Sequence, residues 1–373
     1  MKNCKLLFVG DIVIKKDLNE FLSKKMEDIV KKHDIVSCNL EGPLPTSDAK
    51  PILKVGPNIY QHPNVSKILL KAGFNLINLA NNHIFDYGQK ALNKVLKSFS
   101  EVDLVGAGNS FNEAYKLKII EKKGIRIGFF SFAEWGFGAT TNKNNPGFAW
   151  INHPSINQRI KTAKKIVDIL IIQVHAGAEN VIFPLPEWKR KYRQFVDLGA
   201  DVIIGHHPHT AQGWEIYKQK YIFYSLGNFY FEKNEKNEKN EKDPNWNRGY
   251  MVSISVNKNK LIDFDVIPIK REKNMVKLYQ NPNFKKYLIK LRDSINDQKY
   301  IQNVNLQSLK LWEEIYKEHF ESFSIGKRIK NLIKTILKIR KTSKELVILH
   351  FFKIETHRFT IERAMGILSK KIK

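Results

Sequence analysis

Three histidines stand within four residues, directly after a short apolar run. The run covers residues 202–204 (VII), and the motif GHHPH follows at residues 205–209. A short Val/Ile run is typical of a buried strand, and neutral imidazole is a common metal ligand. We expect Gly205 to let the chain turn sharply at the strand end and the proline to stiffen it, so that His207 and His209 converge on one site. The alternative is a polar loop whose histidines face water.

The same pattern occurs four more times upstream, where a short apolar run ends in polar residues. Several of these runs are separated by apolar residues at helical spacing, and this alternation predicts an α/β fold with parallel strands. In such a sheet the carboxyl ends of the strands lie at one edge, where ligands gather. The polar residues that these turns offer are Asp11, Glu41, Asn82 with His83, and His175 with Glu179.

Carboxylates and imidazoles without thiolates favour Mn, Fe, Zn or Mg over a structural zinc site. A shared carboxylate would hold one or two such divalent ions, as in a two-metal hydrolase that activates water and clamps a phosphoryl group. Asn82 is a candidate to donate to a phosphoryl oxygen or to ligate a metal, and His83 or His206 to protonate a leaving oxygen. For each residue alone a structural role is the alternative, whereas five such turns together favour a site.

Expected strands, helices and loops follow from the same patterns. Residues 43–63 are rich in proline and predict a loop, and the Glu-Lys-Asn repeat at 232–243 predicts a mobile surface loop. The alternating runs 249–256 and 261–269 predict a hairpin, as do 116–120 and 125–132. The remaining expected strands are 5–9, 34–40, 74–80, 103–108, 167–174, 201–204 and 221–229, and the expected helices are 18–32, 65–72, 89–99, 156–166 and 187–198.

The chain changes character beyond about residue 275. Helical patterns at 308–319 and 325–341 replace the strand-like runs, and residues 326–373 hold 14 Lys/Arg against 3 Asp/Glu. We therefore expect a main domain at 1–274 and a basic helical extension at 275–373. A basic amphipathic helix is typical of a segment on a membrane surface or an anionic partner. A helix packed on the main domain with solvated lysines is the alternative.

The net charge of +26 predicts attraction to polyanions. Nucleic acid is the least favoured of these partners, because the chain lacks a recognition motif for it. Cys4 and Cys38 lie in apolar runs and predict buried free thiols. The first apolar run is too short for a signal peptide, and no window reaches ~18 apolar residues. We expect a cytoplasmic protein, with peripheral attachment to the inner membrane face through the basic helices as an open option.

The chain resembles the CapA family, the poly-γ-glutamate and capsule biosynthesis proteins of the metallophosphatase superfamily. The resemblance covers about residues 5–270, in the order of the family. It rests on seven motifs: residues 10–11 (GD), 39–41 (NLE), 79–88 (LANNHIFDYG), 106–108 (GAG), 175–179 (HAGAE), 199–209 (GADVIIGHHPH) and 224–229 (YSLGNF).

This resemblance implies a calcineurin-like metallophosphoesterase fold, a four-layer α/β/β/α sandwich, here with a C-terminal helical extension. It implies a divalent metal site at the sheet edge. The family's first motif is usually Asp-x-His, but Asp11 is followed by Ile12 and Val13, so one ligand is missing and Glu179 is the candidate to supply it. By position, the residues that correspond to metal ligands are Asp11, Glu41 in place of the usual bridging aspartate, Asn82, His175, His207 and His209.

The function implied is that of a metal-dependent hydrolase, which acts on a phosphoester or related bond in capsule or cell-surface polymer biosynthesis. Its substrate would be an acidic or phosphorylated polymer. The alternative is a non-catalytic accessory protein of a polymer synthase, whose cleft binds an acidic glycan or polyglutamate. Asn228 and Arg248 flank the 232–243 segment and are candidates to bind substrate, since Arg248 can pair with a phosphate or carboxylate. A surface role for Arg248 is the alternative.

Overall fold

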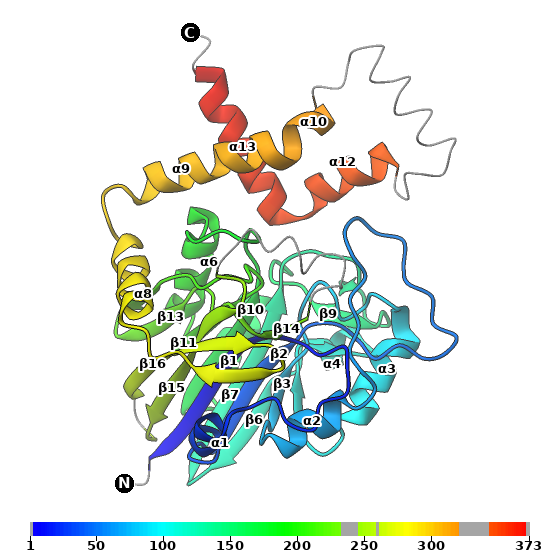
Figure 1. The fold of residues 1–373 in the computed structure, drawn as a ribbon. Coiled ribbons are helices and arrows are strands. Elements are labelled where there is room, and N and C mark those ends of the chain that lie inside the picture. The colour runs from blue at the N-terminus through cyan, green and yellow to red at the C-terminus, as the bar shows by residue number, and fades with distance from the viewer. Residues whose placement is uncertain (1–2, 233–244, 259–260, 321–342, 371–373) are drawn as a thin grey trace.

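Two β-sheets pack face to face at the centre of the molecule, and helices cover their outer faces (Figure 1). The computed structural model describes residues 3–232, 245–258, 261–320 and 343–370. A core of aliphatic and aromatic side chains from both sheets fills the space between them, including Phe8 of the first sheet and Phe129 of the second. Strands with apolar residues on both faces are therefore the expected consequence of this layered packing.

The first sheet has the strand order β17-β16-β15-β1-β2-β3-β4, and β14 also pairs with β1. Strands β1 to β4 are parallel, whereas β15 to β17 form an antiparallel ribbon beside them. The ribbon contains the expected hairpin. The strands are β1 Cys4–Val13, β2 Ile35–Leu40, β3 Leu76–Asn78, β4 Asp103–Val105, β14 Asn228–Phe231, β15 Arg248–Val256, β16 Leu261–Glu272 and β17 Met275–Leu278.

The second sheet has the order β12-β13-β11-β10-β7-β6, with β7, β10, β11 and β13 parallel. A small third sheet of β5 Ala107–Gly108, β9 Gly147–Ala149 and β8 Ala139–Thr140 lies beside it. The strands of the second sheet are β6 Lys118–Lys122, β7 Ile125–Ala133, β10 Ile169–His175, β11 Val202–His206, β12 Trp214–Tyr217 and β13 Lys220–Phe223.

Amphipathic helices form the two outer layers. Helix α3 shows the principle, because Ala91, Leu92 and Val95 are buried at helical spacing while its other face meets solvent. Helices α1 Lys24–Val30, α2 Val65–Lys71 and α3 Gly88–Ser98 cover the first sheet, and α4 Phe111–Ala114, α5 Ile156–Lys164 and α6 Pro186–Asp197 belong to the side of the second. The expected four-layer α/β/β/α sandwich is thus confirmed, and Cys4 and Cys38 are buried free thiols.

Two expected elements differ from the structure. The helix expected at 18–32 begins only at Lys24, because Leu22 forms a β-bridge with Val276 and holds the preceding chain against β17. The single strand expected at 221–229 is two strands, since β13 belongs to the second sheet and β14 to the first. Gly227 has a φ of 74° at the crossing, so the chain turns there and changes sheet. A continuous apolar run carries no sign of such a change.

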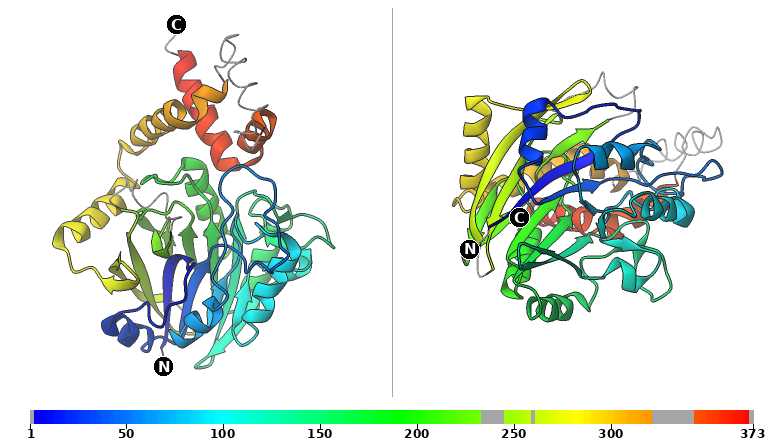
Figure 2. Two further views of the ribbon diagram at one scale, coloured as in Figure 1. Left: turned by 45° about the vertical axis from the view of Figure 1, so that its right-hand side comes forward. Right: turned by 90° about the horizontal axis from the view of Figure 1, so that it is seen from below.

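The helical extension forms a layer above the sandwich (Figures 1 and 2). We call its part beyond residue 299 the roof helices: α9 Tyr300–Leu311, the π-helical turn Trp312–Tyr316, α10 Lys317–Phe320, α12 Lys344–Lys353 and α13 Glu355–Lys370. They share a small core of their own, which Val55 of the 43–63 loop also contacts.

Helix α8 Pro282–Ser294, in contrast, packs into the core between the sheets, and β17 continues the first sheet past residue 274. The division of the chain at that residue stays a prediction. Among the described residues, no helix combines the length and apolar content needed to cross a membrane. The helix expected at 325–341 lies wholly outside the described residues, as does the loop expected at 232–243 beyond its first residue.

Candidate metal centre

Asp11 lies at an irregularity in β1 and not after its end. The strand was expected to stop at residue 9, but it runs on to Val13, and its register with β2 and β14 shifts on either side of Asp11. A Cβ on Gly10 would lie 1.8 Å from the Gly227 carbonyl oxygen, so only glycine lets β14 approach this closely. The bulge therefore turns the Asp11 carboxylate toward the loops of both sheets.

The chain turns at His207 and His209 of the GHHPH motif and not at Gly205, where a turn was expected. Gly205 stays within β11, and its missing side chain leaves room for the Tyr224 carbonyl oxygen, 1.9 Å from where a Cβ would lie. His207 and His209 instead adopt positive φ values of 94° and 57°. Such a backbone is strained for residues other than glycine, and strain of this kind gathers at functional sites.

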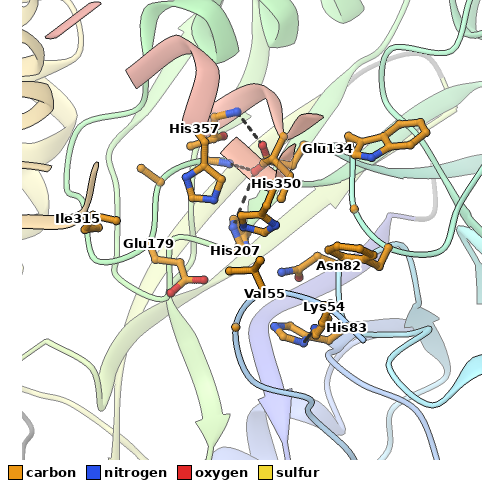
Figure 3. A pocket seen from close by; sticks show the side chains of 18 of the residues that line it. Lys54, Val55, Asn82, His83, Glu134, Glu179, His207, Ile315, His350 and His357 are labelled. Atoms are coloured by element: carbon orange, nitrogen blue, oxygen red, sulfur yellow. Dashed lines mark hydrogen bonds and ion pairs between the residues drawn. The ribbon is translucent and has the colours of Figure 1, made fainter. Parts of the chain in front are cut away.

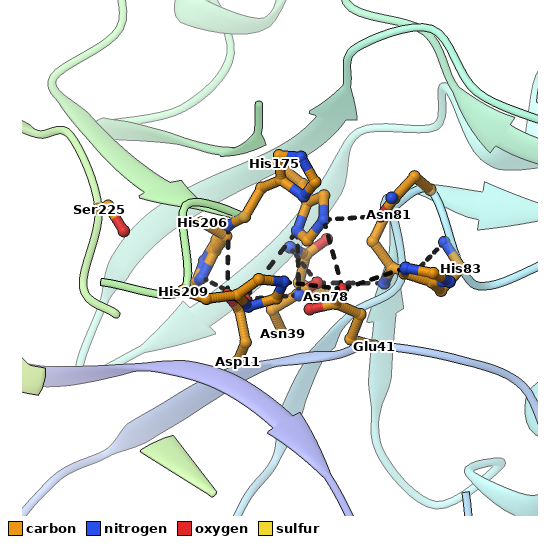
Figure 4. Close-up of polar contacts among 12 residues, drawn as sticks. Asp11, Asn39, Glu41, Asn78, Asn81, His83, His175, His206, His209 and Ser225 are labelled. Atoms are coloured by element: carbon orange, nitrogen blue, oxygen red, sulfur yellow. Dashed lines mark hydrogen bonds and ion pairs between the residues drawn. The ribbon is translucent and has the colours of Figure 1, made fainter. Parts of the chain in front are cut away.

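The structure brings Asp11, Glu41, His175, His207 and His209 together. Figure 4 shows Asp11, Glu41, His175 and His209. His209 lies with Nδ1 3.4 Å from Asp11 Oδ2 and Nε2 3.7 Å from Glu41 Oε1, while His175 lies 3.9 Å from both carboxylates. The buried ligand atoms form two sets. One set is Glu41, His207 and His209, and the other is Asp11, Glu41 and His175. Within each set the ligand atoms all lie within 4.8 Å of one another. Glu41 belongs to both sets, which is the position of a bridging carboxylate.

Glu41 is the strongest sign that a cation belongs here. Its side chain is fully buried, and within the described part of the chain neither carboxylate oxygen has a hydrogen-bond partner. Burial raises the pKa of Glu41 well above its usual range, and the nearby Asp11 adds to the effect. A buried carboxylate needs a proton or a cation to balance it. The surrounding oxygen and nitrogen donors fit a divalent metal ion.

Asp11, in contrast, has partners for its charge. Burial alone would raise its pKa, but the adjacent His206 and His209 imidazoles hold the pKa of Asp11 well below its usual range. The backbone N–H of His207 also donates to Asp11 Oδ2 over 3.2 Å. The centre thus contains two different carboxylates. The protein itself stabilises the charge of Asp11, whereas among the described residues the charge of Glu41 has no such hydrogen-bond partner and would be balanced by a bound cation.

Asn39 orients two of these side chains, a role that the sequence analysis missed. Its Nδ2 donates to Asp11 Oδ1 at 2.8 Å and lies 3.1 Å from His175 Nδ1. Its Oδ1 in turn accepts from the amides of Asn78 and Asn81. The NLE motif contained this residue, and its spacing of two residues from Glu41 is the signal that both side chains face the same side.

Asn82 and His83 lie on the wall of the centre. Asn82 Oδ1 lies 3.0 Å from His175 Nε2, so it orients that ring. His83 Nε2 lies 3.8 Å from Glu41 Oε1, and its Nδ1 lies 2.7 Å from Asp86 and 2.9 Å from the Lys54 ammonium. Lys54 comes from the proline-rich loop at 43–63, and no pattern in the sequence points to it.

His206 lies inside the protein. Its Nδ1 is 3.4 Å from Asp11 Oδ1 and its Nε2 is 3.3 Å from Gln173 Oε1, so neither ring nitrogen reaches the solvent side of the centre. This position favours support of Asp11 over protonation of a leaving group. Asn228 is also buried, and its Oδ1 lies 3.0 Å from His209 Nδ1. Asn228 therefore orients a ligand from the opposite sheet.

The remaining expected residues lie farther out. The Arg248 guanidinium stacks over the Tyr279 ring at 5.3 Å, outside the pocket described below. Glu179 lines that pocket with an exposed side chain, and among the described residues it belongs to neither set of ligand atoms. Its assignment as the missing ligand stays a prediction.

A cavity of about 250 Å³ lies above the centre (Figure 3). The metal-centre side contributes Asn82, His83 and His207, with Lys54 beside them. The other side is made by the roof helices, which the sequence analysis did not connect with the site. The roof residues that line the cavity are Leu311, Ile315, Tyr316, His350, Ile354, Thr356 and His357.

Comparison with known families gives a match over the sandwich. The model for "Bacterial capsule synthesis protein PGA_cap" matches residues 5–233. The chain is 33% identical to the capsule biosynthesis protein CapA of Bacillus anthracis over 71% of this chain and 66% of that protein. It is 32% identical to the PGA biosynthesis protein CapA of Bacillus subtilis over 70% of each chain.

More distant similarities reach other proteins. A Mycobacterium tuberculosis protein, named as a polyglutamine synthesis accessory protein, is 24% identical over 52% of this chain and 55% of its own length. Among solved structures, a hypothetical protein from Thermus thermophilus superposes with a TM-score of 0.46 and 14% identity, covering 72% of this chain and all of that one. A 5'-nucleotidase from Candida albicans gives 0.42 and 14%, covering 83% and 58%.

Proposed function

The chain belongs to the bacterial capsule synthesis family PGA_cap, and we propose that it is a metal-dependent hydrolase of capsule or poly-γ-glutamate biosynthesis. It would cleave a phosphoester or related bond in an acidic or phosphorylated polymer or its precursor. One observation carries the proposal: the buried, partnerless Glu41 carboxylate is shared by two sets of metal-type donors beneath a cavity.

Each residue of the centre has a place in this chemistry. Asp11, Glu41, His175, His207 and His209 would hold one or two divalent ions. A bound ion supplies a lowered pKa for a coordinated water and charge for a phosphoryl oxygen. The protein in turn keeps its ligands oriented before substrate arrives, so little reorganisation is needed during the reaction.

His83 is the candidate proton donor, because it lines the cavity while its Nδ1 contacts Asp86. Lys54 pairs with the same aspartate at 2.5 Å, and burial lowers the pKa of this lysine while Asp86 opposes the shift. Together they place hydrogen-bond donors beside the proposed leaving oxygen. Asn82, beside them, is the candidate to donate to a phosphoryl oxygen.

A second function has its own support. Val13 occupies the position where a histidine ligand is usual, and a relative is named as a synthesis accessory protein. The alternative proposal is therefore that the centre binds a metal and an acidic glycan or polyglutamate without turning it over, as part of a polymer synthase.

The test uses the full chain purified without chelator. Metal content is measured first, and hydrolysis of bis(p-nitrophenyl) phosphate is then measured with added Mn²⁺. We expect bound metal and a turnover that His207→Ala lowers at least about 100-fold, as loss of a metal ligand should. His62→Ala, in the 43–63 loop outside the cavity, should leave turnover unchanged. Bound metal without turnover would favour the accessory role, and absence of bound metal would contradict both.

A further inference from the structure

The roof helices place two histidines over the metal centre. His350 of α12 and His357 of α13 line the same cavity as His207, and their rings lie 4.8 Å apart (Figure 3). The family match ends at residue 233, so these side chains come from a part of the chain that it does not describe. Their role must therefore be read from their surroundings in this molecule.

These histidines keep nitrogen atoms available for a ligand. His350 Nδ1 is buried and has no hydrogen-bond partner among the described residues, a costly state for a polar atom. His357 Nδ1 lies 2.7 Å from the Tyr316 hydroxyl, which orients the ring and leaves Nε2 for another contact. Burial lowers the pKa of His350 to about 4 and that of His357 to about 3, so both rings are neutral near pH 7. Each neutral ring carries one N–H donor.

Hydrogen bonds to the buried Glu355 carboxylate fix the roof in this position. The Glu355 carboxylate accepts from the Trp135 backbone N–H at 2.8 Å, the Trp150 indole at 2.7 Å and the Asn152 amide at 3.0 Å. Glu355 is almost fully buried, and it lies two residues before His357. The first turn of α13 is thus held by the sandwich itself.

A second set of hydrogen bonds joins the roof helices to the loop that follows His175, a candidate metal ligand. The Glu134 carboxylate accepts from the Thr356 N–H of the roof and the Gly177 N–H, both at 3.0 Å. Gly177 stands two residues after His175, and Glu134 Oε1 lies 3.8 Å from His207 Nε2. The roof and the metal centre are therefore tied together through one buried side chain.

We propose that the roof helices are the recognition half of the site, and that His350 and His357 donate hydrogen bonds to a carboxylate or phosphoryl group held over the metal centre. This inference rests on the proposed function in one respect, because it requires the metal centre and the roof helices to contact the same ligand. Ligand pockets usually measure ~300–1,000 Å³. The cavity of about 250 Å³ therefore has room for one acidic unit, such as a chain end or a small precursor.

Binding of small oxyanions to the Mn²⁺-loaded full chain tests this proposal. Inorganic phosphate and glutarate are titrated separately by calorimetry, which distinguishes a phosphoryl from a carboxylate preference. His350→Leu and His357→Leu should each weaken binding of the preferred probe about 3- to 10-fold, the worth of one hydrogen bond. Mn²⁺ affinity should stay within about twofold, since no metal ligand changes. His350→Gln, which keeps a donor, should restore part of the loss.

His319→Leu is the matched control, because His319 belongs to the same layer and lies outside the cavity. Equal probe affinity in the wild-type chain and both cavity-facing leucine variants would overturn the proposal, as would failure of the wild-type chain to bind either probe. Failure of the hydrolase proposal looks different: the wild-type chain would bind Mn²⁺ and a probe in the manner described, yet turn over no substrate.

Discussion

The floor and the roof of the cavity differ in how they are built. The floor consists of side chains from the loops and strand ends of the two sheets, within the segment that matches the capsule synthesis family. Its ligands hold one another, as Asn39 does for Asp11 and His175. The roof comes from later helices and is attached through Glu355 and Thr356, with Arg363 paired to Glu187 and Gln307 bonded to the Phe183 backbone. One cavity thus joins a centre inside the matched segment with a cover that lies outside it.

The largest expected effect is a loss of metal binding at the floor, with the roof helices unchanged. Glu41→Gln removes the charge that both sets of ligand atoms share, so Mn²⁺ affinity measured by calorimetry should fall more than about 100-fold. The roof should remain docked, because Glu41 contributes nothing to it. Glu121→Gln, on the exposed face of β6, is the matched control and should bind Mn²⁺ like the wild-type chain. Affinity within tenfold of wild type would show that Glu41 is not a ligand.

The next effect breaks the roof alone. Glu355→Ala leaves three partly buried donors without their acceptor, and each such group costs up to about 1–3 kcal/mol. Amide hydrogen exchange in α13 should become at least about tenfold faster, whereas Mn²⁺ affinity should stay within about twofold. Glu362→Ala changes an exposed glutamate of the same helix and should leave exchange unaltered. Loss of Mn²⁺ affinity in Glu355→Ala would mean that floor and roof are not separable.

The smallest effect concerns Glu134, which joins the two regions. Burial, with the Glu355 charge beside it, raises its pKa from 4.5 to about 8. Between these values the folded chain keeps a proton that the unfolded chain releases, so the free energy of unfolding should fall as pH rises. The slope is at most about 1.4 kcal/mol per pH unit.

Denaturant unfolding at a series of pH values, with chelator present, measures this dependence. Glu134→Gln cannot ionise, so the wild-type chain should lose stability relative to the variant between pH 4.5 and about pH 8, with a constant difference below pH 4.5. If the free energy of unfolding changed with pH equally in the two proteins, the pKa of Glu134 would not be raised in the folded state.

The floor could be predicted from the sequence because its residues follow apolar runs, and parallel strands bring their ends to one edge. His207 and His209 converge as expected, although through strained backbone and not through Gly205. The role of the His206 ring as a proton donor stays a prediction. That ring turns into the protein toward Gln173.

The roof could not be predicted in the same way. His350 and His357 lie on helices whose apolar pattern shows only that they pack against something. Lys54 comes from a loop without any periodic signal, and its contact with His83 depends on the whole fold. The change of sheet between β13 and β14 was equally hidden, since both strands are apolar and adjoin one another in the chain.

The order of the two regions along the chain has a consequence for how the protein matures. Residues 4–278 supply both sheets, and α12 and α13 follow only after residue 343. Domains fold as units while synthesis proceeds from the N-terminus. On the ribosome the floor therefore emerges first, and an ion can enter it from open solvent before the last helices exist to cover it.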